Sequence, residues 1–296
     1  MKWALAFALL FVACAGSGTA ARKMTADEEA RVATLLADAD KANASRHIEA
    51  ELRRAIQLFE EAVKLDPVNQ KALTQLAKAY YSLAYAFTNG DASKGDDEKE
   101  KDRVNEIKKG FFFKGREYGL RALATNARFA RAMESGAKYQ AAVELVDADH
   151  VEALLWTASN WGRWGELMGV TKVAIDIPKV KAIVDRARKL NPGANFGGVH
   201  RFLGAYFLKI PKFAGQNPKR ARQHFLKAIQ IAPNFLENRL LYAEYYATYA
   251  DDQALFKEQL EFIVKAADDA SVPYRLENMV AKKRAAEMLK NVEKYF

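Results

Sequence analysis

Two stretches of the chain, 55–67 (AIQLFEEAVKLDP) and 221–233 (ARQHFLKAIQIAP), share one pattern of alanine, phenylalanine, alanine and proline. The spacing is A-x3-F-x2-A-x4-P in both, and residues 180–192 repeat it with valine in the first two places. Small residues let two helices cross closely, a large residue fills the gap between them, and proline ends the helix. The pattern therefore predicts three helices that end in the same way.

The segment that follows each proline carries a large, a small and an aromatic residue at helical spacing. These triplets are Leu76-Ala77-Tyr80, Leu203-Gly204-Phe207 and Tyr242-Ala243-Tyr246. Helix pairs that bury their apolar faces only against the next pair are typical of tetratricopeptide repeats, although the period here is longer than the usual ~34 residues. We therefore expect an all-α, tetratricopeptide-like helical repeat (an α-solenoid). It should have about four or five helix pairs and a C-terminal capping helix.

The composition agrees with this expectation. The chain has 296 residues, of which 50% are hydrophobic and 28% charged, with only seven prolines and sixteen glycines. Alanine, leucine, lysine and glutamate dominate the long segments, and these residues favour helix. We assign residues 25–296 to a single helical-repeat domain.

The first residues predict export. A lysine precedes an apolar run at 3–13, which is too short to span a bilayer permanently, so residues 1–13 are typical of a signal peptide. The run ends in FVAC (11–14), which resembles a bacterial lipobox with phenylalanine where leucine is usual. Cys14 is the single cysteine of the chain and the expected lipid attachment site, with 14–24 as a flexible tether. The alternative is ordinary signal-peptide cleavage after Ala15 or Ala20, without a lipid on Cys14.

The formal charge of +9 favours contact with anionic molecules. For an exported protein, anionic lipid headgroups, organic anions or an acidic partner fit better than nucleic acid. Residues 94–109 contain six basic and six acidic side chains, and no basic stripe with interleaved aromatics stands out. We therefore expect dispersed charge and no nucleic-acid partner.

The most unusual composition lies in HVEALLWTASNWGRWGELMG (150–169), where Trp156, Trp161 and Trp164 fall within nine residues. On a helix, Trp156 and Trp164 share a face, whereas Trp161 is turned away from Trp156 by about 140°. More than one neighbour must therefore cover the three rings. They are either buried core between two repeats or the wall of an aromatic-lined cleft, with Asn160 and Arg163 as polar contacts.

A second cluster, Phe196, His200 and Arg201, surrounds Gly197-Gly198 at the start of the next predicted unit. The glycines allow either a tight helix entry or a close approach of the backbone to a ligand. First helices of adjacent repeats line the same concave surface, so the two clusters can share one cleft. The predicted ligand cleft consists of Trp156, Asn160, Trp161, Arg163, Trp164, Phe196, His200 and Arg201.

The two arginines of this cleft leave two interpretations open. A guanidinium is charged at any physiological pH and can bind a carboxylate with two hydrogen bonds, so Arg163 and Arg201 could hold an acidic ligand. They could equally form structural ion pairs with Glu152 or Glu166.

Catalytic and metal-binding patterns are not found in the sequence. The four histidines, His47, His150, His200 and His224, lack metal-type spacing, and no nucleophile elbow or H-E-x-x-H motif occurs. Asp147, Asp149 and Glu152 could be paired acids, but helix capping explains them more simply. We expect no enzymatic activity, no metal site and no cofactor.

Three segments together resemble the T component of TRAP-type transporters, the TatT family. They are LLWTASNWGRWG (154–165), LNPGANFGGVHRFLGAYFLKIP (190–211) and KRARQHFLKAIQIAPNFLENRLLYAEYY (219–246). The resemblance runs in order over about 45–265 and is strongest over 150–246. A lipobox-like start is also typical of that family. The polar insertion 89–98 and the phenylalanine of the lipobox depart from its pattern.

The resemblance implies a non-catalytic periplasmic lipoprotein, anchored to the inner or outer membrane by its lipid alone. It implies a homotrimer, with the periplasmic substrate-binding P component as partner. It further implies a small hydrophobic or organic-acid ligand, held in a cleft or pore of each subunit. The rival interpretation is an envelope assembly scaffold that binds peptides or proteins on the concave surface of the repeats.

Overall fold

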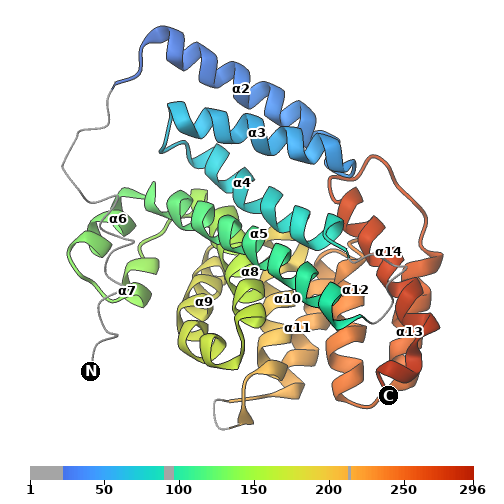
Figure 1. Cartoon of the computed structure of the whole chain (residues 1–296). Helices are drawn as coiled ribbons and strands as arrows, with labels where there is room; N and C mark the ends of the chain where they lie inside the picture. Colours follow the sequence, from blue (N-terminus) through green and yellow to red (C-terminus); the bar gives the residue numbers. More distant parts are fainter. Residues whose placement is uncertain (1–22, 90–96, 213–214) are drawn as a thin grey trace.

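The computed structural model describes residues 23–89, 97–212 and 215–296 (Figure 1). All regular secondary structure in these ranges is helical and no strand occurs in them, which confirms the predicted all-α class. The predicted signal peptide, Cys14 and nearly all of the predicted tether lie outside the described residues. In the described part of the chain, no helix combines the length and apolar character needed to cross a membrane.

The first half of the chain forms a stack of helices in which each packs on the next (Figure 1). The stack begins with α2 and α3, continues through α4 and its π-helical end η1, and reaches the long helix α5. Two short helices, α6 and α7, and a 3-10 turn, η3, follow. The bounds are α2 Ala26–Ala44, α3 Glu49–Leu65, α4 Gln70–Ser82, η1 Leu83–Phe87, α5 Glu98–Ala124, α6 Ala127–Glu134, α7 Tyr139–Val143 and η3 Ala148–His150.

The second half is built around α8, which contacts α4, α5, α9 and α10. Helix α10 packs on α11, and the orange and red helices α12 to α14 cover the other side (Figure 1). The bounds are α8 Val151–Met168, α9 Val170–Leu190, α10 Ala194–Lys209, α11 Pro218–Ile231, α12 Glu237–Leu241, the π-helical η5 Tyr242–Ala247, α13 Gln253–Lys265, α14 Arg275–Lys290 and the 3-10 turn η6 Val292–Lys294.

Local sequence explains most helix ends. Thr25 and Glu28 form a capping box at the start of α2, and the side chains of Asn69 and Asn217 cap α4 and α11. Helices α3, α9 and α11 each end two residues before a proline, as the repeated pattern predicts.

The repeated positions are buried in all three copies, and each is at most 2% exposed. They are Ala55, Phe59, Ala62, Val180, Val184, Ala187, Ala221, Phe225 and Ala228. Gly204 shows why one position must be small. A Cβ placed on Gly204 would lie 2.8 Å from the ring of Phe225, so α10 and α11 can cross at this distance only because residue 204 has no side chain.

Candidate functional site

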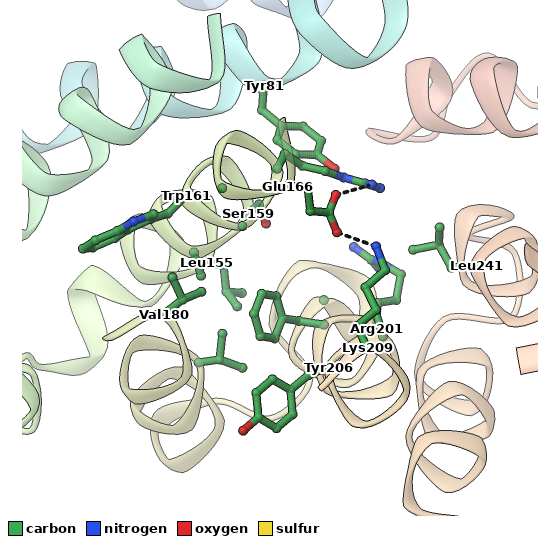
Figure 2. A pocket seen from close by; sticks show the side chains of 18 of the residues that line it. Tyr81, Leu155, Ser159, Trp161, Glu166, Val180, Arg201, Tyr206, Lys209 and Leu241 are labelled. Carbon is green, nitrogen blue, oxygen red and sulfur yellow. Dashed lines mark hydrogen bonds and ion pairs between the residues drawn. The ribbon is translucent and has the colours of Figure 1, made fainter. Parts of the chain in front are cut away.

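A cavity of about 540 Å³ lies between α8, α9 and α10 (Figure 2). Tyr81 of α4 and Tyr85 of η1 line one side, and Leu241, Tyr245 and Leu276 of the C-terminal helices line another. Small-molecule sites in proteins usually have volumes of about 300–1,000 Å³, so the cavity has the size of a ligand site.

Most of the cavity wall is apolar. Helix α9 contributes four aliphatic side chains with the spacing of one helix face, Val173, Ile177, Val180 and Val184. Helices α8 and α10 add aliphatic and aromatic side chains, among them Leu155, Phe202 and Tyr206 (Figure 2). A surface of this kind suits an apolar molecule, because its burial removes hydrocarbon from water on both sides.

One part of the wall is charged. The Arg163 guanidinium donates to Glu166 Oε2 at 3.2 Å and to the Tyr245 hydroxyl at 3.2 Å. The Lys209 ammonium donates to the other carboxylate oxygen of Glu166 (Figure 2). It also donates to the same Tyr245 hydroxyl at 3.2 Å. Two cations thus share two acceptors in a closed arrangement that ties α8, α10 and η5 together. We call these four residues the charged ring.

The contacts within the ring keep Arg163, Glu166 and Lys209 ionised. Tyr245, followed by Tyr81 and Glu166, raises the pKa of Arg163 well above its ordinary value although burial opposes this. Burial alone would raise the pKa of Glu166, but Arg163 and Lys209 outweigh it and the pKa falls. Burial alone would likewise lower the pKa of Lys209, and Tyr245 with Glu166 raises it instead. At neutral pH the ring therefore carries two positive charges and one negative charge.

Trp161 belongs to the same wall and has a fixed orientation. Its indole nitrogen donates to Asp176 Oδ2 of α9 at 2.8 Å, and Lys172 pairs with the same carboxylate oxygen at 2.6 Å. Asp176 is 4% exposed, so the indole and the ammonium supply the partners that a buried carboxylate requires. This contact fastens the apolar face of α9 over the cavity.

Arg201 lines the cavity near the distorted start of α10. Asn195, Phe196 and Gly197 all have left-handed backbone angles, with φ of 49°, 53° and 83°. The Arg201 guanidinium donates to the carbonyl oxygens of Phe196 (2.8 Å) and Asn195 (3.2 Å) and to Asn238 Oδ1 (2.9 Å). These hydrogen bonds stabilise the left-handed backbone, which costs about 1–3 kcal/mol for each non-glycine residue that adopts it.

Four of the eight predicted cleft residues line the cavity: Trp156, Trp161, Arg163 and Arg201. Their assignment to a ligand stays a prediction. Both arginines have a carboxylate nearby, as the ion-pair interpretation predicts. Arg163 pairs with Glu166. Arg201 lies 3.7 Å from Glu237, a partner that the sequence did not suggest. The guanidinium of Arg201 is occupied by the backbone of its own helix start, so Arg163 is the better placed of the two for a ligand.

The other four predicted residues do not line the cavity. Asn160 is fully buried and donates to the carbonyl oxygens of Ala77 and Trp156, which joins α8 to α4. Trp164 packs against the guanidinium of Arg116, 4.1 Å from its ring.

Phe196 stacks on Phe235 with ring centroids 5.2 Å apart. His200 contacts His224 on a different face of α10. Gly197 meets Ala228 of α11, because a Cβ there would lie 2.9 Å from the Ala228 Cα, so the close backbone approach is to a helix.

The acidic residues at and before the start of α8 have partners within the fold. Asp147 binds His150 Nδ1 at 2.6 Å and Asn126 Nδ2 at 2.6 Å, and its side chain does not cap a helix, contrary to our expectation. Glu152 accepts from Trp156 Nε1 at 3.3 Å. In the described part of the chain, no cluster of three or more histidine, cysteine, aspartate or glutamate side chains could hold a metal ion.

Sequence reasoning missed several cavity residues. The aliphatic face of α9 could have been found from its helical spacing, and Glu166 was considered only as an ion-pair partner. Lys209, Tyr245, Tyr81 and Tyr85 carry no local signal, because α4, η1, α10 and η5 meet only in the folded chain.

The fold and the site define an all-α protein with a largely apolar cavity and a fixed charged ring in its wall. The chain belongs to the TRAP transporter T-component (TAtT) family, whose model matches residues 45–296. This confirms the resemblance found in the sequence and makes the protein a component of a TRAP transport system, from an accessory rather than a catalytic family. No curated protein matches the chain.

Proposed function

We propose that the protein is a non-catalytic periplasmic component of its TRAP system that docks a solute-binding protein and holds a small ligand in the cavity. The observation that carries the ligand part is the combination of an apolar wall with the charged ring. An aliphatic body fits the face of α9, while an acidic headgroup fits the ring.

Charge balance within the ring favours an acidic headgroup over a neutral one, although Glu237 and Glu277 also line the cavity. The ring has two cations and one carboxylate, and burial disfavours charge on all three groups. A ligand carboxylate would neutralise the remaining positive charge without displacing Glu166. The Arg163 and Lys209 side chains are 27% and 43% exposed, and their partial shielding from water strengthens the attraction for a ligand carboxylate.

The remaining parts of the proposal rest on the sequence and on family membership. These are a tetratricopeptide-like stack, a lipid anchor on Cys14, a periplasmic location and assembly as a homotrimer with the P component as partner. Burial of all nine repeated positions supports the stack. Metabolic labelling with a radioactive fatty acid tests the anchor: wild-type protein should incorporate label and a Cys14→Ser variant should not.

Ligand binding can be followed by the fluorescence of Trp156 and Trp161, which both line the cavity. We expect octanoate to bind more tightly than 1-octanol and octylamine. A Lys209→Met variant keeps the Arg163–Glu166 pair and should weaken octanoate binding by about tenfold, the loss of one charge-assisted hydrogen bond. Binding of 1-octanol should not change. The exposed Lys257→Met variant is the control, and equal losses in both variants would refute the assignment.

Docking is tested separately by isolating the tagged protein from solubilised membranes and identifying its companions by mass spectrometry. The proposal predicts a TRAP solute-binding protein in stoichiometric amount. Recovery of envelope assembly proteins without it would favour the scaffold interpretation.

A further inference from the structure

The positive charge of the chain is concentrated in one region. Residues 170–231 contain thirteen lysines and arginines and two aspartates, a net charge of +11. The whole chain carries +9, so all other residues together carry −2. The expectation of dispersed charge was therefore wrong. This region folds as α9, α10 and α11, which lie together in the lower part of the molecule (Figure 1). Four of the thirteen cations pair with carboxylates outside the region, and the rest of the surplus is available for an interaction surface.

The three helices form a narrow groove on the side of α10 away from the cavity. One wall consists of Lys181, Asp185 and Arg188 of α9, the other of Arg220 and His224 of α11, and Leu203 and Phe207 of α10 lie between them. The wall residues are spaced four and three apart, so they project from one face of each helix. The groove has a volume of about 150 Å³, enough for side chains but not for a large ligand. We call it the basic groove, and Lys227 extends it by one turn of α11.

The cations of α11 lack acidic partners. The helix contains four basic and no acidic residues, and none of the four forms an ion pair with a described carboxylate. The Arg220 guanidinium stacks on the Phe207 ring at 4.1 Å. Lys227 donates only to Gln230, whereas across the groove Lys181 and Arg188 share Asp185. The groove as a whole therefore has a surplus of positive charge.

A histidine pair reports on this charge. The Nδ1 atoms of His200 and His224 lie 2.9 Å apart, so one ring donates to the other and the two cannot both be protonated at these positions. Burial, His200, Arg220 and Arg188 together lower the pKa of His224 to about 4. Burial, Lys227 and Arg188 lower the pKa of His200. An anion in the groove would raise the pKa of His224, which provides a direct readout of occupancy.

We propose that the basic groove binds an acidic segment of a protein partner, with two or more carboxylates that pair with Arg220, Lys227 and Arg188. The proposal rests on the docking role proposed above and locates one surface for it. Charge complementarity identifies the occupant. A flat anionic membrane fits less well, because the cations flank a recess with an aromatic floor and few apolar side chains project beyond them. Of the large apolar residues of α11, only Leu226 is clearly exposed, at 40%.

The test uses the full folded chain and a fluorescent peptide of alanine with four glutamates, together with its glutamine counterpart. An Arg220→Glu/Lys227→Glu variant changes the groove. A Lys283→Glu/Lys290→Glu variant is the matched control, since it changes two exposed cations seven residues apart on α14 by the same charge. Thermal unfolding checks both variants, and Arg220→Gln/Lys227→Gln replaces the first if it fails to fold.

At low salt we expect the acidic peptide to bind wild-type protein and the control variant alike, and the groove variant at least tenfold more weakly. The glutamine peptide should not bind, and histidine NMR should show a rise in the pKa of His224 on binding. Octanoate affinity should be the same in all variants, which separates a failure of this proposal from a failure of the cavity assignment.

Equal peptide affinity in the groove and control variants would overturn the proposal. Groove-dependent binding to phosphatidylglycerol vesicles without peptide binding would also overturn it and identify a membrane as the occupant. A change in oligomeric state that depends on the groove, without peptide binding, would also overturn the proposal. It would identify a second copy of the chain as the occupant of the groove.

Discussion

The charged ring and the basic groove lie on opposite sides of α10 and use the same residue types differently. In the ring, Arg163 and Lys209 share Glu166 and Tyr245 as fixed partners, while the Lys209 and Glu166 side chains are 43% and 36% exposed. In the groove, Arg220 and Lys227 have no acidic partner among the described residues and lie exposed to solvent. Paired charges in a cavity wall select one geometry and largely compensate one another, whereas unpaired cations on a surface attract over a distance and are screened by salt. The first suits a small ligand and the second a macromolecular partner.

Neighbouring residues of one helix connect the two regions. Arg201 lies beside the cavity and His200 beside the groove. The position of both regions therefore depends on the distorted start of α10.

The largest expected effect comes from Arg201→Met. This change leaves two partly buried carbonyl oxygens and Asn238 Oδ1 without their charged donor, and it leaves Glu237 without its nearby cation. We expect a loss of about 3–5 kcal/mol in the free energy of unfolding, measured in urea. Octanoate and peptide binding should both weaken, because the start of α10 is shared. A loss below about 1 kcal/mol would show that the left-handed turn is stable without the guanidinium.

Glu166→Gln should affect only the cavity. It removes the single carboxylate of the ring, so the two cations attract a ligand carboxylate more strongly. We expect octanoate to bind about tenfold more tightly, equivalent to about 1.4 kcal/mol, with no change in peptide affinity. Calorimetry measures both. Weaker octanoate binding would mean that Glu166 positions the cations rather than competing with the ligand.

Stability should fall on acidification between about pH 6.5 and pH 4. The pKa of His224 is lower in the folded state than in the unfolded state, so protons bind the unfolded chain preferentially in this range. We expect His224→Gln to reduce this loss by about 1 kcal/mol, allowing for partial exposure of the ring. Urea unfolding at pH 7 and pH 4.5 checks it. Glu166, whose pKa is lowered, adds a loss only at more acidic pH, as its carboxylate protonates.

The smallest expected effect is that of salt on the cavity. Raising the NaCl concentration from about 50 to 500 mM shortens the Debye length to less than half. We expect octanoate affinity to change by less than about threefold, whereas the acidic peptide should lose most of its binding. Comparable losses in both would mean that the ring is as exposed as the groove.

The sequence predicted the helices well because their signals are local. Proline, asparagine caps and the repeated spacing determine the ends of α3, α9 and α11 within a few residues. The helix that carries the triplet Leu76-Ala77-Tyr80 is present as α4, but its last turn, η1, is π-helical, and so is η5. This conformation depends on packing between distant segments, which no local pattern records.

The site was predicted only in part, for a related reason. The tryptophan cluster correctly indicated that several neighbours cover α8. The distances between ring centroids are 5.4 Å for Tyr81 and Trp156, 6.0 Å for Tyr139 and Trp161, and 6.1 Å for Phe113 and Trp164. Composition could not show that Trp161 faces the cavity while Asn160 faces α4, because one residue of helix rotation decides it. Lys209 and Tyr245 come from separate helices, so the ring was not visible in the sequence.

A crystal structure of the protein with octanoate tests the central claim most directly. We expect the alkyl chain to lie against Val173, Ile177 and Val180, and the carboxylate to lie within hydrogen-bond distance of Arg163 and Lys209. An empty cavity at saturating octanoate, or a ligand whose carboxylate points away from the charged ring, would contradict it.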